Sequence, residues 1–215
     1  MKIQWYVDLI SGQPLGSRGP SGTAIDALAS ALRLAHGTAA AQNFKFATAL
    51  PQMRCGERPH PGGVLRFFAE ERRHLDAICE AVRARPQVAD SLVIARVRPV
   101  PVGFPASVAY MKFLIASRKS AARVHGEERR RARIARGDLL PYFKVRSSST
   151  GQGFSLRVEH KRLSAEEARE RPVENENAEP NSYGLSVRTR PFFLPDLPVN
   201  IPWNRANLRE LAAAE

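Results

Sequence analysis

The chain of 215 residues has few cysteines, a shortage of acidic residues and no long apolar segment. Its two cysteines, Cys55 and Cys79, form no CxxC pair, so we expect no disulfide framework and a reducing compartment. No run of about 18 apolar residues occurs, which predicts that no helix spans a membrane. The N-terminal segment lacks the charged and apolar regions of a signal peptide. We therefore expect a cytoplasmic protein without membrane attachment.

The shortage of acidic residues leaves 33 Lys and Arg against 21 Asp and Glu, a formal net charge of +12. An excess of this size predicts a polyanionic partner, either nucleic acid or an anionic membrane surface. Half of it lies in residues 118–136, which hold eight basic residues against two acidic ones. The eight are Arg118, Lys119, Arg123, Arg129, Arg130, Arg131, Arg133 and Arg136.

This arginine-rich segment has helical propensity, which Gly126 weakens. Glu127 and Glu128 can pair with only some of its arginines, so the segment repels itself unless a polyanion lies against it. The pattern favours binding to nucleic acid, with an affinity that falls steeply as salt rises. The alternative is a solvated, charged helix face.

Hydrophobic periodicity divides the first hundred residues into strands and helices. The predicted order is strand, helix, strand, strand, helix, strand, over residues 3–9, 23–35, 44–48, 64–68, 70–85 and 92–97. This is the split βαβ, ferredoxin-like plan, with two helices on one face of an antiparallel sheet. The other face is expected to be free, and RNA-binding modules often use such a face. Gly37 is expected to end the first helix.

The second half of the chain predicts a β-hairpin from alternating residues over 139–146 and 153–161. A short strand is expected at Tyr183, and the proline-rich segment over residues 191–202 is not expected to form regular interior structure. We predict an α+β protein with a ferredoxin-like domain over residues 1–98. A smaller α+β domain over residues 99–215 would carry the arginine-rich helix, the hairpin and a C-terminal tail.

His36 is a candidate catalytic residue because it lies on the edge of the apolar face of the first predicted helix. A histidine placed there commonly caps the helix or packs in the core. The functional alternative is a general acid or base near neutral pH. A helix C-terminus would favour its charged form, which suits an acid better than a base.

The predicted hairpin loop follows Arg146 and reads Ser147-Ser148-Ser149-Thr150-Gly151. Such loops are common without any function. Hydroxyls and backbone amides beside an arginine also make a site for a phosphate or a sugar hydroxyl, and the pattern alone does not decide. The histidines lack metal-ligand spacing and the carboxylates are not paired as in a two-metal nuclease, so we expect no metal and no cofactor.

Two strings in this half carry a family resemblance. They read Leu140-Pro141-Tyr142-Phe143-Lys144-Val145-Arg146-Ser147-Ser148-Ser149-Thr150-Gly151-Gln152-Gly153-Phe154 and Tyr183-Gly184-Leu185-Ser186. With an arginine-rich segment upstream and a histidine late in the first helix, the chain resembles the type I-F CRISPR repeat endoribonuclease family. The resemblance implies a ferredoxin-like domain and cleavage of a CRISPR RNA hairpin.

The resemblance also implies roles for four catalytic residues. His36 would take the proton of a 2′-hydroxyl, which Ser147 holds in line and Ser149 supports. Tyr183 would set the position of His36. The alkoxide would attack its own phosphate and leave a 2′,3′-cyclic phosphate, with no metal needed because the nucleophile belongs to the substrate.

The RNA contacts implied in the same way come from the basic helix and the hairpin. They are Lys112, Arg118, Lys119, Arg123, Arg129, Arg130, Arg131, Arg133, Arg136, Arg146, Thr150, Gln152 and Phe154. Phe154 would stack on a base, a contact worth roughly 1–3 kcal/mol. In the family, an Arg-x-Gln pair before the basic helix contacts base edges near the foot of the stem. This pair is missing here, and Lys112 or Arg118 is the candidate replacement.

The resemblance implies that the enzyme is a monomer when free. After cutting, it would stay on its product as a subunit of an RNA-guided surveillance complex. Two alternatives remain at this point: a non-catalytic RNA-hairpin-binding protein, and an unrelated basic assembly protein such as a ribosome-associated subunit.

Overall fold

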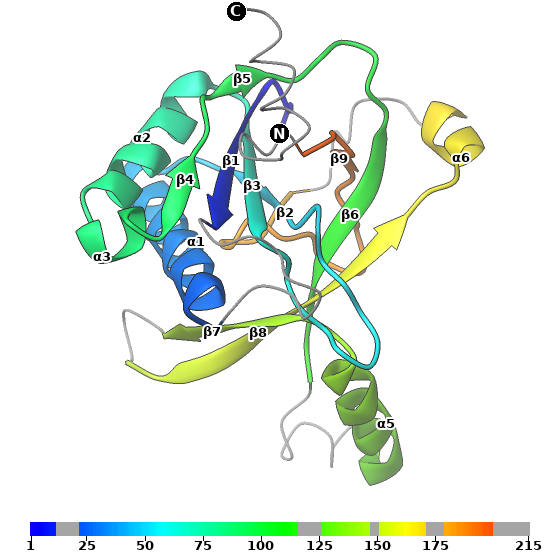
Figure 1. The fold of residues 1–215 in the computed structure, drawn as a ribbon. Coiled ribbons are helices and arrows are strands. Elements are labelled where there is room, and N and C mark those ends of the chain that lie inside the picture. The colour runs from blue at the N-terminus through cyan, green and yellow to red at the C-terminus, as the bar shows by residue number, and fades with distance from the viewer. Residues whose placement is uncertain (12–21, 116–125, 147–150, 171–178, 200–215) are drawn as a thin grey trace, which may run out of the picture.

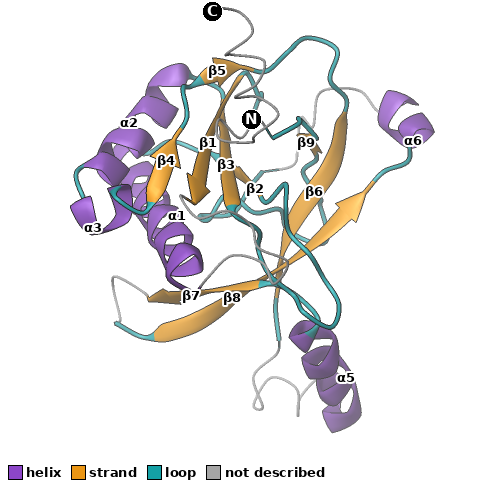
Figure 2. Ribbon diagram, in the orientation of Figure 1, coloured by secondary structure: helices purple, strands orange, loops and turns teal. Residues whose placement is uncertain are grey.

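The computed structural model describes residues 1–11, 22–115, 126–146, 151–170 and 179–199. In this part of the chain, two antiparallel sheets lie side by side with helices around them (Figure 1; Figure 2). No helix in these ranges is long and apolar enough to cross a membrane. The α+β class predicted from the sequence is confirmed.

The first sheet comes from the N-terminal half of the chain. Its elements are β1 (Trp5–Ser11), α1 (Gly22–Gln42), β2 (Ala47–Ala49), β3 (Val64–Ala69), α2 (Arg72–Arg83), α3 (Pro86–Ala89), β4 (Leu92–Ile94) and β5 (Arg98–Pro99). The strand order is β2-β3-β1-β4, every pairing is antiparallel, and β5 also pairs with β1. This order is that of the predicted ferredoxin-like plan.

Helix α1 does not end at Gly37, as the sequence pattern predicted, but runs on to Gln42. A glycine inside a helix costs about 1 kcal/mol relative to alanine. The residues after it offset that cost, because most are alanines and Ala39 packs into the core. The helix ends instead at Asn43, which has a φ of 52°, and the Phe44 N–H bonds the Ala39 carbonyl at 3.0 Å.

The second sheet comes from the C-terminal half and has the strand order β7-β8-β6-β9. Its elements and the helices near them are β6 (Ala106–Phe113), α5 (Gly126–Asp138), β7 (Tyr142–Arg146), β8 (Gly153–Arg162), α6 (Ala165–Glu170) and β9 (Leu194–Pro195). The predicted hairpin is therefore confirmed as β7 and β8. Strand β6, at the centre of this sheet, was not predicted.

The prediction that the proline-rich segment forms no regular interior structure was wrong, because this segment contributes a strand and several buried side chains. Strand β9 pairs with β6, and Phe192, Phe193 and Leu197 are buried beside it. Prolines at an edge strand cost no ladder hydrogen bond, which is why the segment can still pair. Ser186 forms an isolated bridge to Met111 rather than a longer strand after Tyr183.

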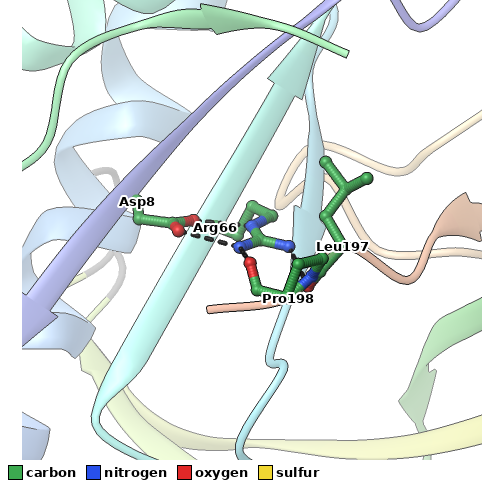
Figure 3. A network of polar contacts seen from close by, with 4 residues as sticks. All are labelled: Asp8, Arg66, Leu197 and Pro198. Atoms are coloured by element: carbon green, nitrogen blue, oxygen red, sulfur yellow. Dashed lines mark hydrogen bonds and ion pairs between the residues drawn. The ribbon is translucent and has the colours of Figure 1, made fainter. Parts of the chain in front are cut away.

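The sheet face opposite α1 and α2 is covered, so the prediction that it is free for RNA was wrong. Asp8 and Arg66 lie opposite each other on β1 and β3, and their side chains alternate with those facing the helices. Arg66 is 1% exposed and donates to both Asp8 carboxylate oxygens, at 2.6 and 2.8 Å. It also donates to the carbonyls of Leu197 and Pro198, which binds the C-terminal segment to this face (Figure 3).

One hydrophobic cluster joins the two halves of the molecule. It includes Val7 and Phe67 from the first sheet and Val158, Leu156 and Phe192 from the second half. The predicted domain boundary after residue 98 falls between β4 and β6, at the short strand β5. It stays a prediction.

Candidate active site and RNA interface

His36 lies on α1, and its half-buried ring faces a turn from the far end of the chain. The Nδ1 atom is 2.7 Å from the carbonyl oxygen of Ser182, a residue 146 positions away in the sequence. The imidazole also stacks on Tyr183, with ring centroids 4.5 Å apart and planes at 24°. Two neighbouring residues of one turn therefore hold the ring, one through an edge and one through a face.

That turn is organised by Asn181. Its side-chain oxygen accepts the N–H of Tyr183 at 2.8 Å and that of Leu185 at 3.2 Å. Its backbone N–H bonds the Leu185 carbonyl, and its carbonyl accepts the N–H of Gly184. We call residues 181–185 the Asn181 turn. Asparagine side chains bond their own nearby backbone readily, which is why they favour such turns.

Strand β2 holds the Asn181 turn in place. The Thr48 hydroxyl donates to the Tyr183 carbonyl, and the Thr48 N–H donates to the Gly184 carbonyl, both at 2.8 Å. Gly184 has a φ of 73°, and a Cβ there would lie 2.5 Å from the Thr48 hydroxyl oxygen. Glycine is thus required both by the backbone conformation and by the close approach to β2.

Phe154 extends this arrangement from the β7–β8 hairpin. Its ring meets Tyr183 edge-on, with centroids 6.2 Å apart, and Lys112 Nζ lies 5.9 Å from its centroid. We call His36, Tyr183 and Phe154 the aromatic row. Phe154 is 36% exposed, so part of its ring is available to a ligand. Helix α1 packs against β7, which brings the hairpin beside His36.

The hairpin loop is closed by Arg146, whose Nε donates to the Gly151 carbonyl at 2.7 Å. The predicted residues Ser147, Ser149 and Thr150 lie between these two and outside the described residues. Gln152 lies exposed, immediately before β8.

Helix α5 carries the described arginines of the basic segment and projects away from the second sheet (Figure 1). Arg118, Lys119 and Arg123 lie outside the described residues, as does the side chain of Arg129. Arg131 is exposed and Arg130 is half-buried. The predicted basic helix is therefore confirmed from Gly126 onward.

Two arginines of α5 contact the protein itself. Arg133 donates to the Leu114 carbonyl at 2.7 Å, and its guanidinium lies 5.0 Å from the Phe113 ring centroid. Arg136 lies 5.7 Å from the same centroid and pairs with the buried carboxylate of Glu159 at 2.8 Å. These contacts anchor the C-terminal half of α5 to β6 and β8, a role that the sequence pattern did not reveal.

Burial raises the pKa of the Tyr183 phenol, and the nearby positive charge of Arg33 opposes part of that rise. Among the described residues, no three His, Cys, Asp or Glu side chains are placed to hold a metal ion.

Sequence reasoning missed Ser182, Asn181 and Thr48, which position His36 and Tyr183. Asn181 could have been found, since an asparagine three residues before a glycine is typical of a turn. Thr48 gave no such sign, because its two bonds cross from β2 to a turn 135 residues further along the chain.

Comparison with known proteins adds a family to this geometry. The family model described as CRISPR-associated protein (Cas_Csy4) matches residues 24–203. No curated protein matches the chain significantly.

Solved structures are similar at low identity. A Cas6-related protein from Pyrococcus furiosus is 12% identical, with 90% of this chain and 99% of that chain covered and a TM-score of 0.34. A RAMP protein that binds different RNA substrates is also 12% identical, with 86% and 98% covered and a TM-score of 0.31. A putative chlorite dismutase reaches 12% identity, 91% and 92% coverage and a TM-score of 0.27.

The family match spans most of the chain, from α1 with His36 to the segment after β9. It includes the hairpin, the basic helix and the Asn181 turn. The chain belongs to the Cas_Csy4 family of CRISPR-associated proteins, the type I-F repeat endoribonucleases that bind and process CRISPR RNA.

Proposed function

We propose that this protein cuts CRISPR precursor RNA at the 3′ foot of a repeat hairpin, with His36 as the general base. The observation that carries the proposal is the contact of His36 Nδ1 with the Ser182 carbonyl at 2.7 Å. A carbonyl only accepts, so Nδ1 carries the proton. In the neutral ring the lone pair is then on Nε2, which is the atom that takes a proton from the substrate.

The reaction needs one proton transfer and one exchange of bonds at phosphorus. Nε2 takes the proton of the 2′-hydroxyl, and the 2′-oxygen forms a bond to the adjacent phosphorus as the bond to the 5′-oxygen breaks. The leaving oxygen takes a proton from the imidazolium or from water. The products are a 2′,3′-cyclic phosphate and a free 5′-hydroxyl. Because nucleophile and phosphate belong to one molecule, positioning supplies much of the rate without a metal.

Other residues would orient the substrate around His36. By the family resemblance, Ser147 holds the 2′-hydroxyl and Ser149 supports it, while Tyr183 fixes the imidazole. The stacking of Tyr183 on His36 supports that role. Phe154 would stack on a base of the hairpin, and its partly exposed ring beside Lys112 supports this contact.

The basic residues would hold the stem. Lys112 and Arg146 flank the aromatic row and the hairpin loop, and Arg131 is exposed on the projecting helix α5. The proposed RNA-binding set is completed by Arg118, Lys119, Arg123, Arg129, Arg130, Arg133, Arg136, Thr150 and Gln152.

The product would stay bound, since hairpin contacts do not depend on the bond that is cut. We include in the proposal that the protein, a cytoplasmic monomer when free, then serves as a subunit of a type I-F-like surveillance complex.

The test uses a labelled repeat hairpin from the source genome, in EDTA. Wild-type protein is expected to cut it once and to bind, without cutting, a copy that carries a 2′-deoxy sugar at the cleavage position. His36→Ala is expected to bind the hairpin as tightly as wild type and to cut it at least 10³-fold more slowly. His74→Ala is the matched control, because His74 also stacks on an aromatic ring, that of Phe44, but lies on α2.

Two results would overturn the proposal. Cutting by His36→Ala at the wild-type position and rate would show that another group is the base. Tight binding of the natural hairpin by wild-type protein without any cutting would show that the protein is a non-catalytic RNA-binding module.

A further inference from the structure

Gly37 lies in the interior of α1, and no described residue requires a glycine at this position. It lies next to His36 on α1, with the helix continuing to Gln42. A Cβ placed on Gly37 would meet no atom within 4 Å, and the residue is exposed. Glycine weakens a helix interior, so a residue with a side chain would be expected here. A glycine is favoured if a ligand approaches the helix backbone closely.

Arg33 lies on the same face, one turn before. Arg33, His36 and Gly37 occupy positions i, i+3 and i+4 of the helix, which makes them neighbours on its surface. Arg33 is exposed, and no carboxylate of the described residues pairs with it. Burial raises the pKa of Tyr183, and the positive charge of Arg33 opposes part of that rise. The guanidinium therefore lies close enough to act on the phenol.

These three residues give the exposed face of α1 a definite chemistry. Near His36, this face carries an exposed arginine, for which the described residues supply no carboxylate partner, and a glycine without a side chain. A guanidinium binds phosphate oxygens through two parallel N–H donors, and a glycine lets a bulky ligand approach a helix closely. The substrate implied by the proposed function carries a phosphate next to the hydroxyl that His36 would deprotonate.

We propose that Arg33 and Gly37 form a docking site for the scissile phosphate beside His36. The RNA backbone lies against α1 at Gly37, and Arg33 contacts the non-bridging oxygens of the phosphate under attack. Negative charge grows on these oxygens as the 2′-oxygen adds to phosphorus, so Arg33 stabilises the transition state more than the bound substrate. This inference rests on the proposed function and adds a catalytic residue to it.

The test measures single-turnover cleavage and binding separately. Arg33→Gln is expected to slow cleavage about 10²-fold while the Kd for the hairpin changes less than about threefold. Arg33→Lys should recover part of the rate, because it restores the charge but not the two parallel donors. Arg83→Gln, a loss of an exposed arginine on α2, is the matched control and should cut like wild type.

Gly37→Ala separates a ligand role from a structural one. The substitution should raise the Tm, because alanine favours the helix and its Cβ meets no atom of the described residues within 4 Å. It should nevertheless slow cleavage about 10-fold or more, since the methyl group holds the RNA away from α1. A variant that is more stable and cuts more slowly cannot be explained by damage to the fold.

The outcomes distinguish this inference from the proposed function. If Arg33→Gln and Gly37→Ala cut at the wild-type rate while His36→Ala does not cut, the phosphate site is wrong and the base stands. If His36→Ala cuts as wild type does, the proposed function fails, and the site fails with it. Slow cutting by both new variants, with intact binding, supports the site.

Discussion

The imidazole of His36 and the phenol of Tyr183 stack with their centroids 4.5 Å apart, so the face of Tyr183 orients the proposed base together with the Ser182 carbonyl. Tyr183→Phe is therefore expected to keep single-turnover cleavage within a few-fold of wild type. Tyr183→Ala removes the face and should slow cleavage about 10²-fold, since small misplacements of a reacting group have effects of that size.

The same pair predicts a pH dependence. Because burial raises the pKa of Tyr183, its phenol keeps its proton below its ordinary titration range near pH 10. The pH–rate profile of Tyr183→Phe between pH 5 and 9 should then have the shape of the wild-type profile. A changed shape would mean that the phenol proton takes part in the reaction, and the role given to Tyr183 would be wrong.

Gly184→Ala should displace the Asn181 turn from β2. The φ of 73° strains alanine by about 1–2 kcal/mol, and the new Cβ would lie 2.9 Å from the Thr48 backbone nitrogen. The control is Gly103→Ala, which has a similar φ of 87° but meets nothing within 4 Å. Urea unfolding should show a larger loss for Gly184→Ala by about 1–3 kcal/mol, together with slow cleavage. Equal losses would mean that the contact with β2 does not hold the turn.

Arg131→Ala should affect RNA binding but not folding, because Arg131 is exposed on the projecting helix α5. Loss of one phosphate contact is expected to reduce the slope of log K against log salt by about one, with the Tm unchanged. An unchanged slope would remove Arg131 from the interface. Binding titrations at several salt concentrations measure it.

Arg136→Ala should instead cost stability, because among the described residues it leaves the buried carboxylate of Glu159 with Arg188 alone, at 3.8 Å. We expect a loss of about 1–2 kcal/mol in the free energy of unfolding. If Arg136→Ala weakens binding as Arg131→Ala does but leaves stability intact, the ion pair does not anchor α5.

Arg66→Ala should destabilise the fold strongly. Arg66 is almost fully buried, and its loss leaves Asp8 and the carbonyls of Leu197 and Pro198 without their donor (Figure 3). Breaking such a pair typically costs about 3–5 kcal/mol. Arg72→Ala is the control, since its pair with Asp76 is exposed and at 3.4 Å, and it should cost less than about 1 kcal/mol. A loss below 1 kcal/mol for Arg66→Ala would mean that the network is not what holds the C-terminal segment.

Much of the fold could be predicted because its signals are local. The apolar spacing of Leu75, Ile78, Cys79 and Val82 predicted α2, and all four are buried in one face of it. The alternation around Phe143 and Leu156 predicted the hairpin, since a strand shows its two faces in every second residue. Local signals failed at Gly37, where helix propensity and packing after the glycine outweighed its cost.

The sequence was enough to predict six strands and helices of the ferredoxin-like half but not α3 or β5. It also predicted the hairpin and the basic helix, and its two strings indicated the family. Only the tertiary structure decided how they meet. It placed Ser182 against His36 and covered the sheet face at Arg66, and it turned Arg133 and Arg136 toward the protein. Periodicity reports which side of an element is apolar, whereas these contacts join residues far apart in the chain. They depend on how elements pack, which no local pattern contains.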